Sequence, residues 1–151
     1  MNIFPRIGAA IAIAVLAAAP AAADGLRVEA RGGILLSPGR TDPVAGFVGG
    51  YEIDLGEDAV IGAEISADKV LAGWADTFVG LSGRGGVRLG ADGVLFAAGG
   101  YTFRPGDDAW HAGGGYEHMF SQNGYLKVDY RHWFDDLVPA DQISAGIGLK
   151  F

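Results

Sequence analysis

The sequence lacks cysteine altogether, which excludes a disulfide framework and any thiolate metal site. Beyond residue 23 it also lacks an apolar run that approaches the roughly 20 residues of a membrane-spanning helix. Hydrophobic residues nevertheless make up 50% of the chain, and its 26 glycines disfavour helix interiors. Such a composition is typical of a β-barrel in which outward apolar residues alternate with inward small or polar ones.

The N-terminal residues have the composition of an export signal. A small apolar run at 7–19 follows a basic residue, Pro20 ends the run, and the alanines at 21–23 fit an Ala-x-Ala cleavage site. The run is too short to cross a bilayer as a helix. The sequence therefore predicts a cleaved signal peptide at 1–23 and one mature domain at 24–151.

Downstream of the signal, apolar and polar residues alternate with the period of two that is characteristic of β-strands. In the first segment Val28, Ala30 and Ile34 share one face, whereas Arg27 and Glu29 lie on the other. Segments of about 10 residues have the length that a tilted strand needs to cross a bilayer. The alternation predicts strands at 26–36, 45–55, 59–68, 77–89, 94–104, 110–120, 125–133 and 142–151.

The connections between these strands alternate in character. Three are tight turns, and two of these end in Asp-Gly or Asn-Gly, dipeptides that favour β-hairpins. The tight turns lie at 56–58, 90–93 and 121–124, and the looser connections at 37–44, 69–76, 105–109 and 134–141. Short turns on one side and longer loops on the other predict an all-β fold, an eight-stranded antiparallel transmembrane up-and-down β-barrel.

Strand parity also sorts the charged residues, and it places none of them in the middle of the lipid-facing surface. An eight-stranded barrel is narrow enough for its own side chains to fill it. Charges in such a confined interior must pair, because an unpaired buried charge is strongly unfavourable. The eight basic and seven acidic side chains predicted to face the lumen are Arg27, Arg31, Arg84, Arg88, Arg104, Lys127, Arg131 and Lys150, and Glu29, Glu52, Asp54, Glu64, Asp68, Glu117 and Asp129.

This near balance predicts a largely closed lumen that is held by an ion-pair network. We expect Glu117, Asp129 and Glu52 to be its acidic hubs, with arginines and a lysine as partners. A narrow porin-like channel is the alternative. The predicted network consists of Arg27, Glu29, Arg31, Glu52, Glu64, Arg84, Arg88, Glu117, Lys127, Asp129 and Arg131, in which Arg84, Arg131 and Lys127 are the expected partners of the hubs.

The last third of the chain resembles the OmpA-like and opacity-protein-like family of small outer-membrane barrels. The resemblance rests on the Gly-Gly-Gly-Tyr-Glu segment at 113–117, the polar turn at 121–124 and the Leu-Lys-Val-Asp-Tyr-Arg segment at 126–131. It implies a location in the outer membrane of a Gram-negative bacterium, among outer-membrane lipids and lipopolysaccharide. It implies no cofactor.

The C-terminal residues look like the signal that the outer-membrane assembly machinery reads in such barrels. Phe151 is the last residue, and Leu149 and Ile147 alternate before it on the same face. The resemblance thus implies the assembly machinery, and periplasmic chaperones in transit, as partners.

One constellation of histidines and carboxylates raises the possibility of a metal site or of an outer-membrane hydrolase. Such groups can bind a divalent cation or activate water. Parity sends His111 inward and His132 outward, so we expect these groups not to converge. Negative loops also argue against nucleic acid. The candidates, which lie in or beside two neighbouring loops, are Asp107, Asp108, His111, His132, Asp135 and Asp136.

The sequence therefore predicts a non-enzymatic barrel of the structural or surface-antigen type. The narrow channel and the Asp/His hydrolase remain alternatives to it.

Overall fold

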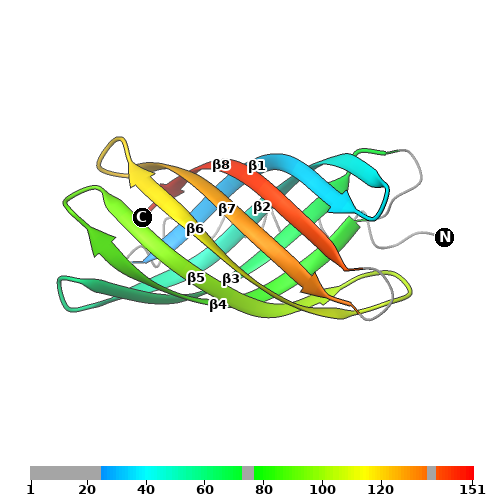
Figure 1. The fold of residues 1–151 in the computed structure, drawn as a ribbon. Helices are drawn as coiled ribbons and strands as arrows, with labels where there is room; N and C mark the ends of the chain where they lie inside the picture. The colour runs from blue at the N-terminus through cyan, green and yellow to red at the C-terminus, as the bar shows by residue number, and fades with distance from the viewer. Residues whose placement is uncertain (1–24, 73–76, 136–138) are drawn as a thin grey trace.

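The computed structural model describes residues 25–72, 77–135 and 139–151. Within them, eight strands form a closed antiparallel barrel in which each strand pairs with its sequence neighbours and the last pairs with the first (Figure 1). The predicted eight-stranded all-β barrel is thereby confirmed. The strands are β1 (Leu26–Ser37), β2 (Arg40–Leu55), β3 (Ala59–Val70), β4 (Thr77–Leu89), β5 (Gly93–Phe103), β6 (Ala109–Met119), β7 (Gly124–Phe134) and β8 (Ala140–Lys150).

The two ends of the barrel differ in their connections. One end carries the short connections at 56–58, 90–92 and 120–123, and we call it the turn end. Both termini of the described chain lie there, because the Gly25 N–H donates to the Phe151 carbonyl oxygen at 2.9 Å. The opposite end is called the loop end. In the described part of the chain, no helix is long and apolar enough to span a membrane.

The first connection at the loop end corrects the sequence prediction of a loose loop at 37–44. β1 extends to Ser37 and β2 begins at Arg40, so that only two residues form the turn, and Gly39 has a φ of +75°. Glycine adopts such a φ without steric cost. Pro43 lies within β2, where it has no N–H to donate but its carbonyl oxygen accepts the N–H of Leu71 at 2.8 Å.

The two faces of the sheet differ sharply in polarity, as the alternation predicted. On the outer face Phe47 and Leu81 are 57% and 56% exposed, and apolar residues of every strand surround them. On the inner face Arg27 and Glu117 are each 1% exposed. An apolar exterior around a charged interior inverts the arrangement of a water-soluble protein and suits a lipid environment.

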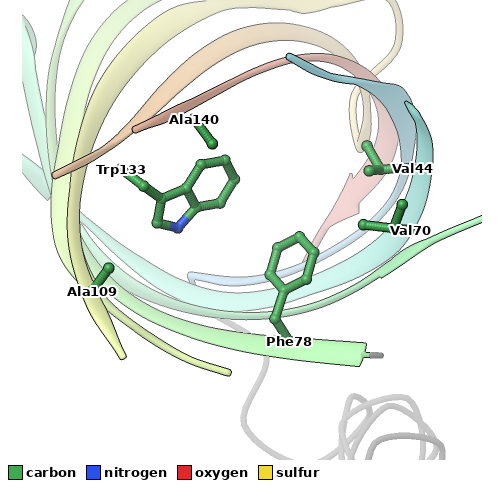
Figure 2. Packing of buried hydrophobic residues seen from close by; sticks show 6 residues of the cluster. All are labelled: Val44, Val70, Phe78, Ala109, Trp133 and Ala140. Atoms are coloured by element: carbon green, nitrogen blue, oxygen red, sulfur yellow. The ribbon is translucent and has the colours of Figure 1, made fainter. Parts of the chain in front are cut away.

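An apolar cluster lies in the lumen near the loop end (Figure 2). Trp133 is 1% exposed, and its ring meets that of Phe78 edge to face, with centroids 5.7 Å apart. We call this cluster the apolar plug. It consists of Val44, Val70, Phe78, Ala109, Trp133 and Ala140.

Candidate functional site

The largest group of charges in the lumen lies toward the turn end and is centred on Arg27. Its Nη2 lies 2.8 Å from Glu117 Oε2, and its Nη1 lies 3.0 Å from Glu52 Oε2. Lys150 Nζ contacts the second oxygens of the same two carboxylates, at 2.5 Å for Glu117 and 2.9 Å for Glu52. Arg84 Nη2 lies 3.3 Å from Glu117 Oε2. Glu117 and Glu52 are therefore shared by the same three cations, from β1, β4 and β8.

This group, which we call the central ion cluster, also reaches β7. Lys127 Nζ lies 2.8 Å from Glu29 Oε1. The hydroxyl of Tyr125 donates to Glu29 Oε2 at 3.0 Å and accepts from Arg27 Nη2 at 3.1 Å. The members of the central ion cluster are the cations Arg27, Arg84, Lys127 and Lys150 and the carboxylates Glu29, Glu52, Glu64 and Glu117.

A second group, the Asp68 cluster, lies between the central ion cluster and the apolar plug. Arg31 binds Asp68 through two bonds, from Nε at 2.8 Å and from Nη2 at 2.5 Å. Arg131 Nη1 approaches the same carboxylate at 3.9 Å, and Asp129 lies 3.8 Å from Arg31 Nη1. Ser144 donates to Asp129 at 2.9 Å. A bidentate arginine–carboxylate pair is among the strongest polar contacts in proteins.

Two glycines make room for these carboxylates. A Cβ at Gly46 would lie 2.3 Å from Asp68 Oδ1, and a Cβ at Gly146 would lie 2.6 Å from Glu29 Oε1. Both distances are shorter than any van der Waals contact. A side chain at either wall position would displace the neighbouring carboxylate from the place it occupies in its ion pairs.

Charge in the interior is balanced within each group. The central ion cluster holds four cations and four carboxylates, and the Asp68 cluster holds two of each. Each buried charge thus has its counter-charge within the wall itself. The lumen does not need a bound ion to be neutral, which is the condition for a closed interior in low dielectric.

The structure differs from the predicted network at three positions. Arg88 pairs with Asp54 at the turn end, where the two side chains are 33% and 65% exposed, and it does not join the central ion cluster. Asp129, an expected hub, contacts Arg31 as its cation. The cations shared by Glu117 and Glu52 include Lys150, which the sequence predicts to face the lumen but does not place in the network. Parity gives the direction of a side chain but not its partner across the lumen.

The candidate metal and hydrolase residues do not converge. His132 faces outward, and its Nδ1 lies 2.7 Å from Asp141 Oδ1. Asp135 instead accepts a bond from Arg104 Nη2 at 2.9 Å. Asp108 accepts the backbone N–H of Arg104 and Asp107 is exposed, whereas Asp136 lies outside the described residues.

In the parts of the chain that the structure describes, no group of three or more histidine and carboxylate side chains could hold a metal ion. Asp141, the partner of His132, had been placed in a loop and was therefore missed. In the register of β7 and β8, Asp141 lies directly opposite His132, and that register would have revealed the pair.

His111 lies inside the lumen, under the apolar plug. It is 3% exposed, its Nε2 lies 2.7 Å from Ser82 Oγ, and its Nδ1 lies 2.8 Å from Thr102 Oγ1. The indole N–H of Trp133 donates to Thr102 Oγ1 at 2.9 Å. A chain of hydrogen bonds thus links strands β4, β5, β6 and β7 through buried side chains. We call it the His111 relay.

A cavity lies at the turn end. A cavity of about 540 Å³ enters the barrel there, between the segment Tyr51–Asp54, the β4–β5 turn and the last two residues. Glu52 and Lys150 line it. The cavity leads to the central ion cluster, so the lumen is a recess that is closed at its inner end by ion pairs.

A closed eight-stranded barrel with an apolar outer face and an ion-paired lumen is the fold of the small outer-membrane barrels, and this chain has that fold. No family model matches the sequence, and neither does any curated protein. The likeness is therefore one of structure.

Three solved structures illustrate this likeness. The N-terminal β-barrel domain of Pseudomonas aeruginosa OprF has a TM-score of 0.62 and 14% identity, covering 83% of this chain and 97% of its own. Ail, the attachment invasion locus protein of Yersinia pestis, has a TM-score of 0.60 and 13% identity, covering 85% and 99%. Neisserial surface protein A has a TM-score of 0.54 and 14% identity, covering 83% and 96%. At this level of identity the comparison establishes the fold.

Proposed function

We propose that this chain is an exported, non-enzymatic structural barrel of the Gram-negative outer membrane, with a lumen that conducts no steady ion current. The observation that carries this proposal is the double closure of the interior. The apolar plug fills the loop end, and two internally neutral ion clusters fill the rest of the passage toward the turn-end cavity. A passage filled in this way leaves no aqueous bore.

The outer face supports a position within a lipid bilayer. Exposed aromatic side chains lie near both ends of the barrel, as in the interfacial girdles of transmembrane barrels. Trp110 and Phe134 are 66% and 60% exposed toward the loop end, and Tyr51 and Phe120 are 48% and 54% exposed toward the turn end. The partners in this position are outer-membrane lipids and, on the loop side, lipopolysaccharide.

Short connections limit what the barrel can present to the outside. In the proposed orientation the turn end faces the periplasm, as short turns do in such barrels. The loop end then offers the two-residue turn at 38–39 and connections at 71–76, 104–108 and 135–139. A surface-antigen role would rest on these four segments alone, so we favour a structural role.

Conductance in planar bilayers tests the closed lumen. We expect the full-length mature protein, purified from outer membranes, to show no steady conductance at neutral pH. A stable, ion-selective open state in the unmodified protein would contradict the proposal and favour the porin-like channel. Recovery of the protein from the inner-membrane or soluble fraction, instead of the outer membrane, would contradict the proposed location.

We further propose that residues 1–23 are a cleaved signal peptide and that the C-terminal ridge of Ile147, Leu149 and Phe151 is read by the assembly machinery. The three side chains are 55%, 47% and 39% exposed on the outer face, so they form an accessible apolar ridge. Periplasmic chaperones could bind the same apolar ridge before the barrel is inserted into the membrane.

Changing Phe151 to Asp should reduce the folded, heat-modifiable protein in outer membranes and leave unfolded protein in the periplasm. Phe120→Asp is the matched control, because Phe120 is an exposed aromatic residue at the same end of the barrel. Equal assembly of the two variants would contradict a specific role for Phe151. N-terminal sequencing of the mature protein checks the cleavage site.

A further inference from the structure

The His111 relay couples the apolar plug to the polar interior. Trp133 is the largest side chain of the plug, and its indole nitrogen donates to Thr102 Oγ1 at 2.9 Å. Thr102 is fully buried, and Ser82 is 4% exposed. Since water does not reach these groups, every proton in the chain must be matched to an acceptor within it.

This requirement assigns the tautomer of the histidine. Thr102 Oγ1 accepts the proton of Trp133 and carries one proton of its own, for which His111 Nδ1, 2.8 Å away, is the acceptor. Nδ1 is therefore unprotonated. In a neutral ring the proton then resides on Nε2, which donates to Ser82 Oγ at 2.7 Å. The same assignment excludes Ser82 as a nucleophile activated by His111, because the nitrogen that faces it is a donor.

Charged groups from other strands face the ring of His111. Arg131 on β7 and Arg31 on β1 are cations close to it, and Glu64 and Asp68 on β3 are the facing carboxylates. Asp68 is already engaged by both arginines. A charged imidazolium would thus be a third cation around an occupied carboxylate.

We propose that His111 is a pH-sensitive latch on the apolar plug, so that protonation of its ring breaks the relay to Trp133 and admits water to the loop end of the lumen, as far as the Asp68 cluster. A proton on Nδ1 would confront the proton of Thr102. Thr102 would then have to turn its own proton toward a site without an acceptor or give up its bond to Trp133. This inference rests on the proposed function, since a latch requires a lumen that is closed at neutral pH.

Hydrogen exchange of the Trp133 indole N–H as a function of pH tests the latch. The unmodified full-length protein is followed by NMR in bilayers from about pH 8 down to about pH 3, a range that brackets the titration of histidine. We expect a protected indole N–H at the upper end and, after correction for the intrinsic effect of pH on exchange, a loss of protection of about tenfold or more at the acidic end. In His111→Gln, which is neutral at every pH, the indole N–H should remain protected throughout.

The control separates His111 from the carboxylates, which also titrate in acid. Loss of protection of equal size in His111→Gln would overturn the latch, and so would an unmodified protein in which the indole N–H stays protected at every pH. Steady conductance already at neutral pH would contradict the proposed function instead, so the two failures are distinguishable.

A second measurement does not depend on the folding of a His111 variant. Changing Trp74 and Trp110 to Phe leaves Trp133 as the reporter of the plug. Acrylamide should quench its fluorescence weakly at neutral pH and severalfold more strongly in acid, with the same midpoint as the loss of indole protection. Imidazole ¹⁵N NMR of the unmodified protein should show His111 protonated on Nε2 at neutral pH. The opposite tautomer, or quenching that does not change with pH, would overturn the proposal.

Discussion

The two ends of the lumen achieve closure by different physical means. At the loop end Trp133 and Phe78 pack with four smaller apolar side chains of the plug. Toward the turn end the interior is filled by charged side chains in which four cations face four carboxylates. One end depends on packing, and the other depends on pairing.

This difference has consequences for how each end tolerates change. A packed apolar group loses stability in proportion to the volume removed. A buried ion-paired group loses most when a single partner is removed, because the remaining charge is left without compensation. Removal of side-chain volume therefore tests the apolar plug, and removal of one charge tests the central ion cluster.

The largest loss is expected for Arg27→Met, which removes the shared cation of the central ion cluster while keeping an unbranched side chain. Three carboxylates lose a partner, so the free energy of unfolding should fall by about 3–5 kcal/mol. Urea titration of the barrel in defined bilayers measures it. Arg40→Met is the control, since this side chain is 50% exposed and its loss should have little effect. Equal losses in the two variants would mean that water penetrates the cluster.

A somewhat smaller loss is expected for Phe78→Ala, which leaves a cavity beside Trp133. We expect about 3 kcal/mol, at the lower end of values for buried phenylalanines, because the plug borders a polar layer. The same bilayer titration measures it. Phe103→Ala, on the outer face, removes the same group without making an internal cavity. A cost for Phe103 as great as for Phe78 would contradict the packing role of the plug.

The smallest effect is expected at the outermost ion pairs of the two ends. Arg88→Gln breaks the exposed pair with Asp54 at the turn end and should cost less than about 1 kcal/mol. Arg104→Gln at the loop end breaks a pair with Asp135, whose side chain is only 9% exposed, and should cost more. The comparison is made by equilibrium unfolding at low and high salt. A larger cost for Arg88 would contradict the ranking by exposure.

The direction of the side chains could be predicted from the sequence, whereas their partners could not. The period of two fixed Arg27 as inward, but its partner Glu117 lies 90 residues away and is brought close only by closure of the barrel. Phe78 and Trp133 occupy inward positions too, and they were missed because inward positions were interpreted as polar. A narrow lumen can be filled by either kind of residue.

Local composition misled the prediction at the loop end. Pro43 and Asp42 led us to expect a loose connection, yet both belong to β2, and the turn is formed by the Pro-Gly pair before it. The histidines beside the loops point in opposite directions, His111 into the lumen and His132 outward. The His132–Asp141 pair was missed because Asp141 lies in β8, which begins at Ala140, two residues earlier than we expected.

Pairing between β1 and β8 has a consequence for the order of folding. The register that joins Arg27 to Lys150 links the first strand to the last, so this seam is the contact of highest sequence separation in the barrel. Such contacts form late, because the entropy of closing the longest loop must be overcome first. Until then the chain is an open sheet with two unpaired edges, each able to add a foreign strand. Arg27 on β1 and Lys150 on β8 both bind Glu52 and Glu117. These four side chains of the lumen therefore come together only when the seam has closed.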